Sequence, residues 1–452
     1  MNVHFIAIGG SAMHNMAIAM HKKGFKVTGS DDEILEPSKS RLAACGLLPA
    51  SEGWFPEKIN EKLDAVILGM HARADNPELL KAQQLGLKIY SYPEYIYEQT
   101  KEKTRIVIGG SHGKTSITAM ILHVLQHQKI DFDYMVGAQL QGFDTMVKLT
   151  KEARIAVIEG DEYLSSPIDR RPKFHLYKPN IAIVSGIAWD HINVFPTFEN
   201  YVDQFSIFVS LIEKDGSLIY CELDKEVKKV CEEARADIKK YPYGIPTNKI
   251  VNGTTILMTE KAEVPLKVFG DHNLMNINAA KLACNQVGVS DAQFYEAIQS
   301  FGGAAKRLEL VSKNEVTAVY KDFAHSPSKL KATTQAVKKQ FPDRKLIAIM
   351  ELHTFSSLNQ DFLNQYEGSM ALADQAIVYF NPHTIAHKKL KPITTEQVQK
   401  AFGRKDILVV TDSKEVLNTI LGIDFKNKNL LLMSSGNFDG MDFKDLSNKI
   451  VK

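Results

Sequence analysis

Short apolar runs alternate with amphipathic stretches along most of the chain. In the first hundred residues the apolar runs predict strands over Val3–Ile8, Phe25–Asp31, Leu63–Leu68 and Leu87–Tyr90. Met13, Ala17 and Met20 recur at near-helical spacing, and Asn76-Pro77-Glu78 opens another helix. Strands separated by helices predict a parallel sheet with crossover connections.

The same alternation continues after a polar stretch, Glu98–Thr104, which we interpret as a linker. Strands are predicted over Arg105–Ile108, Arg154–Ile158, Ile181–Val184, Val316–Tyr320, Lys345–Met350, Gln375–Tyr379, Ile407–Val410 and Leu430–Met433. We expect Lys214–Leu266 to be irregular and a helix to run from about Asn273 to Val287. The third region starts near Gly302-Gly303, so the chain is predicted to be α/β, with three units over 1–103, 104–302 and 303–452.

Composition narrows the class of protein. The 452 residues carry 55 Lys and Arg against 53 Asp and Glu, a net charge of +2, which argues against a nucleic-acid-coating protein. Apolar residues make up 44% and charged residues 24%, as in folded soluble proteins. The four cysteines form no CxxC, and neither a leader nor a bilayer-length apolar run is present. We therefore expect a cytoplasmic protein with no membrane or nucleic-acid partner.

The most informative motif follows the strand that starts at Arg105. It comprises Gly110, Ser111, His112, Gly113, Lys114, Thr115 and Ser116 and leads into an amphipathic segment. Glycines let backbone amides wrap a phosphate, Lys114 would neutralise the β and γ phosphates, and Thr115 would bind Mg²⁺. The spacing is shorter than GxxxxGK[ST], because Ile108 stands where the first glycine belongs. A glycine turn with a surface lysine is the weaker alternative.

A second glycine loop lies at the N-terminus. Gly9, Gly10 and Ser11 follow the first strand, and Asp31 ends the second. The GxGxxG pattern is broken at Ser11 and His14, so an NAD site is disfavoured. A phosphate or nucleotide moiety at this helix start is favoured over a mere tight turn.

Six motifs in order resemble those of the Mur ligases, the ATP-dependent amide-bond-forming enzymes of peptidoglycan synthesis. They are Gly110–Thr115, Glu159–Glu162, Asp190-His191, His272–Asn276, Lys306–Glu309 and Asp322–Pro327. The resemblance extends over nearly the whole chain. It implies a Rossmann-like N-terminal domain that binds a UDP-sugar, a central P-loop-type ATPase domain and a Rossmann-like C-terminal domain for the amino acid or peptide.

The resemblance also implies roles for individual residues. Catalysis would involve Lys114, Glu159, His191 and Arg307, and Mg²⁺ would be held by Thr115, Glu159 and His191. Asn273, Asn276, Arg307, Asp322 and His325 would join the glycine loop in binding ATP. Taken alone, Asn273 is more simply a helix N-cap, and His191 a hydrogen-bonded loop histidine.

Within the family, the N-terminal sequence resembles the branch that acts on UDP-N-acetylmuramate. ATP would phosphorylate its lactyl carboxylate, and an amine would attack the acyl phosphate. The UDP-sugar would lie against Gly9, Gly10, Ser11, Met13, Ser30, Asp31 and His71.

One member of this branch adds L-alanine, and another adds the recycled tripeptide L-Ala-γ-D-Glu-meso-diaminopimelate. Tyr163, Arg170–Tyr177 and Met433–Gly440 resemble the second member. The run Arg170, Arg171 and Lys173 would face the anionic peptide together with His353, although a solvated face is its default interpretation. His353 itself stands where the recycling member has arginine.

We therefore expect an ATP- and Mg²⁺-dependent ligase for the tripeptide, as a monomer or weak homodimer with small-molecule substrates. The L-alanine-adding enzyme is the alternative. A nucleotide-binding protein with a degenerate ligase fold is a remote one, because Lys114, Glu159 and Arg307 are all present.

Overall fold

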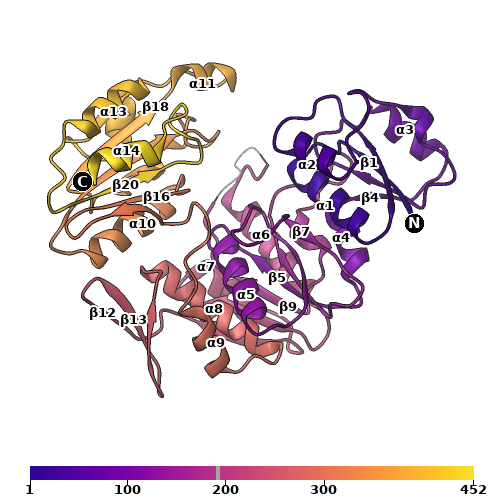
Figure 1. The fold of residues 1–452 in the computed structure, drawn as a ribbon, viewed down its shortest axis with the longest axis horizontal. Coiled ribbons are helices and arrows are strands. Elements are labelled where there is room, and N and C mark those ends of the chain that lie inside the picture. The colour runs from indigo at the N-terminus through magenta and orange to yellow at the C-terminus, as the bar shows by residue number, and fades with distance from the viewer. Residues whose placement is uncertain (190–193, 452) are drawn as a thin grey trace. The chain divides into compact units, whose positions relative to one another are not determined.

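The computed structural model describes residues 1–189 and 194–451, which form two compact units (Figure 1). Unit 1 comprises Met1–Gly244 and Ile277–Ala297, and unit 2 comprises Ile245–Asn276 and Ile298–Lys452. Each unit contains two sheets, and helices flank the larger ones (Figure 1). The predicted α/β class is confirmed. The three-domain boundaries at 103 and 302 stay a prediction.

Residues 2–91 form a parallel four-stranded sheet in unit 1, with strand order β2-β1-β3-β4. Ile6 of β1 lies opposite Ser30 and Leu68, so the carboxyl ends of β1, β2 and β3 meet at one edge. The strands are β1 (Asn2–Ile6), β2 (Lys26–Ser30), β3 (Ala65–Leu68) and β4 (Ile89–Ser91). The helices are α1 (Ser11–Lys22), α2 (Ser38–Ala44), η1 (Pro56–Lys58), α3 (Pro77–Gln84) and α4 (Tyr92–Thr100).

The start of α4 shows how local sequence sets these elements. The Ser91 hydroxyl accepts from the Glu94 amide, and the Glu94 carboxylate accepts from the Ser91 amide, a capping box that satisfies two helix-end donors. The helix then runs to Thr100 and β5 begins at Thr104. The predicted linker over 98–104 is therefore wrong in part, because residues 98–100 form the end of α4.

Arg105 is the largest fully buried side chain in the chain as described, and it fixes the connection that follows α4. Its guanidinium donates to the carbonyl oxygens of Thr100, Lys101, Lys103, Tyr177 and Lys178 at 2.7–3.1 Å, and its Nη2 lies 3.2 Å from Glu213 Oε1. Two of these carbonyls end α4, where helix geometry leaves them without intrahelical partners. A cation at a helix C-terminus is also favoured by the helix dipole.

The second sheet of unit 1 has seven strands in the order β11-β10-β9-β5-β8-β6-β7, all parallel except β6–β7. Its strands are β5 (Thr104–Gly109), β6 (Phe132–Met135), β7 (Val147–Lys148), β8 (Ile155–Glu159), β9 (Ile181–Val184), β10 (Ser217–Cys221) and β11 (Lys239–Tyr243). Its helices are α5 (Lys114–His127), η2 (Lys173–Leu176), α6 (Phe198–Ser210) and α7 (Lys225–Glu232). The central strand β5 carries the glycine loop.

The stretch 214–266, expected to be irregular, is regular throughout most of its length. Ser217–Cys221 is fully buried as β10, and β11 pairs with it in parallel. Asn248–Leu266 forms a separate antiparallel sheet in unit 2, with β12 (Asn248–Val251), β13 (Thr254–Met258) and β14 (Glu263–Leu266). The half-exposed strands β11, β12 and β13 have mixed composition and form no apolar run, whereas β10 is a buried apolar run that the prediction missed.

Unit 2 is dominated by a six-stranded sheet with the order β15-β16-β20-β17-β18-β19. Only β15 is antiparallel, at the edge, and it was not predicted. The strands are β15 (Glu309–Lys313), β16 (Ala318–Asp322), β17 (Lys345–Leu352), β18 (Gln375–Phe380), β19 (Leu408–Val410) and β20 (Lys428–Met433). The helices are α10 (Pro327–Gln340), η3 (Leu363–Tyr366), α11 (Pro382–His387), α12 (Thr395–Ala401), α13 (Ser413–Leu421) and α14 (Phe443–Ile450).

Two further helices complete the described chain, α8 (Asp271–Gln286) and α9 (Asp291–Ile298). None of the helices within residues 1–189 and 194–451 is long and apolar enough to cross a membrane. The four cysteines are all free thiols.

Candidate active site

The turn between β5 and α5 has the backbone that a phosphate loop requires. Gly110 and Gly113 have φ angles of +137° and +82°, a region that favours glycine. A Cβ on Gly110 would lie 2.2 Å from Ser185 Oγ and 3.0 Å from the Ser185 amide nitrogen. The Ser111 amide donates to Gly186 O at 2.9 Å, and the single proton of Ser185 Oγ is shared between the carbonyls of Gly109 and His112. The loop is thus fixed against the end of β9, at the N-terminus of a 14-residue helix.

Thr115 and Glu159 form a pair of oxygen donors beside this loop. Thr115 Oγ1 donates to Glu159 Oε1 at 2.8 Å, and the Gly137 amide donates to Glu159 Oε2 at 2.8 Å. Glu159 ends β8, directly opposite Ile108 of β5, so the sheet itself brings the carboxylate to the loop. Both side chains are buried.

This donor set fits Mg²⁺, which takes one or two carboxylates, hydroxyl oxygens, substrate phosphates and waters. No cluster of three His, Cys, Asp or Glu side chains that could hold a metal occurs among the described residues. Thr115 and Glu159 would hold the Mg²⁺ ion. The predicted ligand His191, with Asp190, lies outside the described residues.

The Lys114 ammonium lies between the loop and a buried carboxylate. Its Nζ donates to Gly110 O at 2.6 Å and to Glu162 Oε2 at 2.5 Å. Burial acts to lower the pKa of Lys114, but the Glu162 carboxylate and its acidic neighbours outweigh it and the pKa is raised. Lys114 is therefore a cation at neutral pH. Glu162 belongs to one of the motifs in the sequence, but the motif predicts no role for it.

The residues predicted to bind the UDP-sugar meet at the carboxyl edge of the first sheet. The Gly9 amide donates to Asp31 Oδ2 at 2.7 Å, and Ala7 and Ile8 donate to Ser30 O. A Cβ on Gly10 would contact both the Met13 side chain and the His71 ring, and Ser11 begins α1. Burial raises the pKa of Asp31 to about 6.

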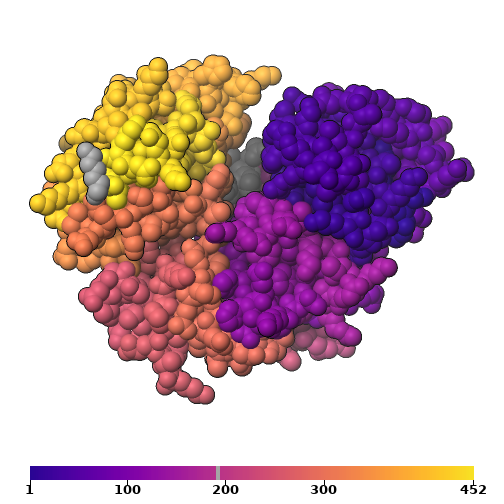
Figure 2. All heavy atoms as spheres, in the orientation of Figure 1, coloured from indigo at the N-terminus to yellow at the C-terminus, as the bar shows by residue number. Residues whose placement is uncertain are grey.

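Contacts that the sequence analysis missed join this edge to the second sheet within unit 1, whose two parts touch in the space-filling view (Figure 2). The Met146 amide donates to Asn15 Oδ1 at 2.9 Å, and Arg41 Nη2 donates to Gln139 Oε1 at 3.0 Å. The segment that carries Gln139 and Met146 begins next to Gly137, the donor to Glu159. No motif marks these residues.

Unit 2 holds the remaining residues predicted to bind ATP. Asn273 and Asn276 are buried near the start of α8. Because α8 begins at Asp271 and Asn273 Nδ2 donates to Phe269 O at 2.9 Å, the simpler interpretation of Asn273 as an N-cap is wrong.

Arg307, Asp322 and His325 lie around the end of β16. The guanidinium of Arg307 stacks 4.8 Å from the Phe323 ring centroid, and Asp322 accepts from the amides of Leu308 and Ala324. His325 Nδ1 lies 2.8 Å from Phe323 O. Asp322 thus fixes the turn that carries Arg307 and His325.

Most of the predicted basic run is neutralised by carboxylates. Arg171 pairs with Asp169 at 2.6 Å and Glu94 at 3.4 Å, and Lys173 pairs with Asp161 at 2.5 Å. Arg170 is exposed. In unit 2, His353 Nδ1 lies 3.6 Å from Glu351 Oε1. The role of these four residues in binding a peptide stays a prediction.

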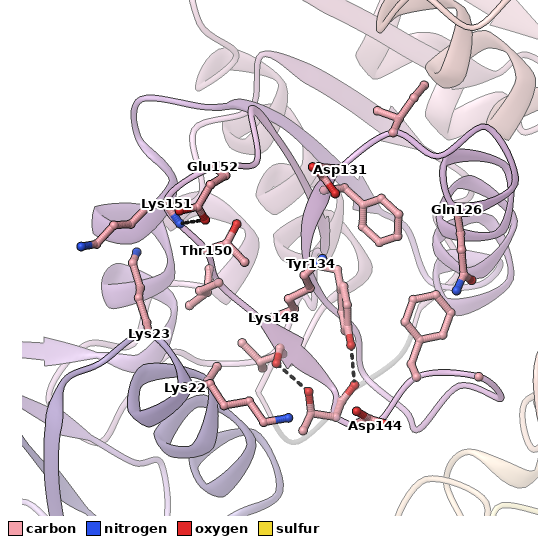
Figure 3. Close-up of a pocket in the computed structure, with 18 of the residues that line it drawn as sticks. Lys22, Lys23, Gln126, Asp131, Tyr134, Asp144, Lys148, Thr150, Lys151 and Glu152 are labelled. Atoms are coloured by element: carbon pink, nitrogen blue, oxygen red, sulfur yellow. Dashed lines mark hydrogen bonds between the residues drawn. The ribbon is translucent and has the colours of Figure 1, made fainter.

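A cavity of about 800 Å³ in unit 1 is separate from the glycine loop (Figure 3). It is lined by Lys22 and Lys23 from the end of α1, by Gln126 at the end of α5, and by Tyr134 and Lys148 from β6 and β7. The length of α5 separates it from the loop by about 20 Å, at 1.5 Å per helical residue.

The fold and the loop together define a class of protein. A buried parallel strand, a glycine turn, a Lys-Thr pair at the following helix and a carboxylate on the adjacent strand characterise enzymes that bind a nucleoside triphosphate with Mg²⁺.

Comparison with known families identifies the family within this class of enzymes. Three models match in sequence order: the Mur ligase family catalytic domain over residues 2–104, the Mur ligase middle domain over 108–284, and the Mur ligase glutamate ligase domain over 306–436. The chain belongs to the Mur ligase family. It is an ATP-dependent amide-bond ligase that uses Mg²⁺.

Individual relatives cover nearly the full chain. The UDP-N-acetylmuramate–L-alanine ligase of Lactiplantibacillus plantarum is 28% identical and matches 92% of each sequence. Among solved structures, the UDP-N-acetylmuramate-alanine ligase of Thermotoga maritima has a TM-score of 0.68 at 21% identity, covering 97% of this chain and 96% of its own. The murein peptide ligase of Psychrobacter arcticus has a TM-score of 0.64 at 24% identity, covering 100% and 98%. The two structures share the fold.

Proposed function

We propose that the protein joins L-alanine to the lactyl carboxylate of UDP-N-acetylmuramate at the expense of ATP. The names of its sequence relatives support L-alanine as the amine, ahead of the tripeptide that the local motifs favour. The observation that carries the ligase proposal is the cluster of Lys114, Thr115 and Glu159 at the phosphate loop. An inactive binding protein would not need all three.

The reaction requires positive charge at the site, because anionic groups must meet there. Carboxylate, triphosphate and acyl phosphate are all anionic, so they can approach one another only where positive charge is held in place. Lys114 would supply one such charge to the phosphate that is transferred. Thr115 and Glu159 would hold Mg²⁺, which screens the phosphate oxygens. The buried position of Glu159 keeps this carboxylate where the phosphates arrive.

The other substrates are assigned to the remaining sites. We propose that the edge formed by Gly9, Gly10, Ser30, Asp31 and His71 binds the UDP-sugar. The UDP nucleotide lies against backbone amides at the start of α1, where the helix dipole favours phosphate.

Roles are proposed for six more residues. Asn273, Asn276, Arg307, Asp322 and His325 would contact ATP, and His353 would contact the amine substrate. Both ATP and a UDP-sugar are cytoplasmic metabolites, so we place the reaction in the cytoplasm.

The tripeptide is the second candidate. The observation in its favour is the segment before η2, which hydrogen bonds hold in shape and which carries Arg170 into solvent. Ser165 Oγ donates to Asp169 O at 2.8 Å, and the Ser165 amide donates to Arg171 O at 3.0 Å. An exposed guanidinium on a segment of fixed backbone suits the extra carboxylates of a peptide. L-alanine, with one carboxylate, has no need of it.

Phosphate release distinguishes these possibilities. The protein is incubated with ATP, Mg²⁺ and UDP-N-acetylmuramate, and with either L-alanine or the tripeptide. We expect release that depends on L-alanine. Phosphate release with the tripeptide but not with L-alanine would show that the tripeptide is the amine substrate, and the proposal that the protein is a ligase would stand. An absence of phosphate release with either amine would contradict the proposed function. The matched variant is R170A, which we expect to slow only the reaction with the tripeptide.

A further inference from the structure

Glu162 and Tyr201 are hydrogen-bonded to each other, and each is joined to one residue of the phosphate loop. Glu162 follows β8, and Tyr201 is in the first turns of α6. Glu162 Oε2 lies 2.5 Å from Lys114 Nζ, and Glu162 Oε1 lies 3.1 Å from the Tyr201 hydroxyl. The Tyr201 hydroxyl is also 2.9 Å from Ser111 Oγ. Two residues outside the glycine motif therefore hold two residues within it.

The hydrogen bonds run in one direction. An ionised carboxylate only accepts, so the single proton of the Tyr201 hydroxyl goes to Glu162, and Tyr201 accepts from the Ser111 hydroxyl. Ser111 Oγ in turn accepts from the Ala188 amide at 2.8 Å. The chain of bonds closes on the loop because Lys114 donates both to Glu162 and to Gly110 O.

Burial makes this arrangement rigid. Glu162 is 1% exposed, and Tyr201 is fully buried with its ring against Phe195 and Phe205, at centroid distances of 5.4 and 5.3 Å. A buried carboxylate is retained only when it is paired and hydrogen-bonded. The aromatic packing on α6 directs the Tyr201 hydroxyl at the carboxylate, so the position of the ammonium depends on a side chain 87 residues away in sequence.

We propose that Glu162 and Tyr201 are positioning residues for the phosphate loop. An ammonium group has three N–H bonds, and Gly110 and Glu162 accept two of those of Lys114. No other acceptor for it is found within residues 1–189 and 194–451. We infer that its third N–H would donate to the phosphate that the loop receives. The proposal rests on the use of ATP by this family but not on which amine is the substrate.

The test separates catalysis from nucleotide binding. Removing the carboxylate in E162A releases the ammonium, and a misplacement of about 1 Å can slow a reaction about 100-fold, so kcat falls by about that factor. The same change removes a negative charge near the triphosphate, so the KM for ATP and the affinity for a fluorescent ATP analogue do not weaken. E162Q retains the size and an acceptor oxygen and keeps an intermediate kcat, about 10-fold below wild type.

Two further variants make the test specific. Y201F lowers kcat with no change in the KM for ATP. Because both residues act on the same ammonium, E162A/Y201F is no slower than E162A alone. The matched control is D133N, because Lys103 and Asp133 form a pair of the same 2.5 Å length with an equally buried carboxylate elsewhere in unit 1. We expect D133N to lower the melting temperature without changing kcat.

The outcomes are decisive in both directions. Wild-type kcat in E162A overturns the proposal, and so does a fall in kcat that is accompanied by equally weakened ATP binding and is reproduced by D133N. If the wild type turns over neither amine, the proposed function fails by itself. In that case the positioning role of Glu162 is tested by the ¹H–¹⁵N NMR signal of the Lys114 ammonium, which is assigned by its absence in K114R. That signal is present in wild type and lost in E162A if the proposal holds, and its persistence in E162A overturns it.

Discussion

The phosphate loop depends on the absence of a side chain at Gly110, and G110A tests this directly. The added methyl group would have to occupy the position now taken by Ser185 Oγ, at 2.2 Å, with the amide nitrogens of Ser185 and Gly186 at 3.0 and 3.1 Å behind it. Those amides directly follow β9, and the Ser185 amide donates to Gly109 O at 3.1 Å. The backbone cannot move without breaking the sheet, so the loop must change its conformation.

The cost can be worked out from these contacts. Alanine at a φ of +137° is strained by about 1–3 kcal/mol. Displacing the Ser185 hydroxyl also breaks the hydrogen bond whose single proton is shared between Gly109 O and His112 O, at about 1 kcal/mol. A total of about 2–4 kcal/mol, needed to keep the loop in its nucleotide-binding form, corresponds to an affinity for ATP lowered about 30-fold or more.

Equilibrium binding of a fluorescent ATP analogue in the presence of Mg²⁺ measures this loss. The matched control is G142A. Gly142 also has a positive φ, +83°, but a Cβ there meets nothing within 4 Å. We expect G142A to bind the nucleotide as wild type does. If G110A binds within about 3-fold of wild type, well under 1 kcal/mol, the loop assignment is refuted.

Three further predictions address stability, metal binding and pH. R105M removes the donor to five carbonyls and should lower the free energy of unfolding of unit 1 by about 3–5 kcal/mol, as measured by guanidinium denaturation; a change under about 1 kcal/mol would contradict the role of Arg105. T115V keeps the side-chain volume but removes the hydroxyl, so the Mg²⁺ concentration that half-saturates phosphate release should rise about 10-fold or more, whereas an unchanged value would exclude Thr115 as a ligand. Because burial raises the folded-state pKa of Asp31 to about 6 from 3.8, the native state keeps this proton longer than the unfolded chain, and its contribution to stability falls as pH rises from about 4 to 6. The difference in melting temperature between D31N and wild type should therefore increase over that range, and a constant difference would refute the shift.

Structural features that depend on residues close together in the sequence could be predicted. The strand and helix around Gly110–Thr115 could be predicted because a buried run, a glycine turn and an amphipathic helix are adjacent in sequence. Glu159 could be placed because a parallel sheet aligns the carboxyl ends of neighbouring strands, and β8 lies beside β5. The order of motifs then identified the family.

Features that depend on distant contacts were not predictable. Tyr201 lies in an ordinary amphipathic helix, and only the fold brings its hydroxyl to Glu162. Arg105 is predicted as part of a strand, but its burial follows from carbonyls more than 70 residues away in sequence. From the sequence, Lys173 was predicted to bind an anionic substrate. In the structure, its ammonium forms an ion pair with Asp161 instead.

The central claim is that the loop around Lys114 drives formation of an amide on UDP-N-acetylmuramate. Mass spectrometry of the sugar nucleotide after incubation with ATP, Mg²⁺ and L-alanine tests it most directly. We predict that the UDP-N-acetylmuramate signal is replaced by one heavier by an alanine residue, that this conversion requires ATP, and that K114A abolishes it. A sugar nucleotide of unchanged mass with either L-alanine or the tripeptide, or full conversion by K114A, would contradict the account.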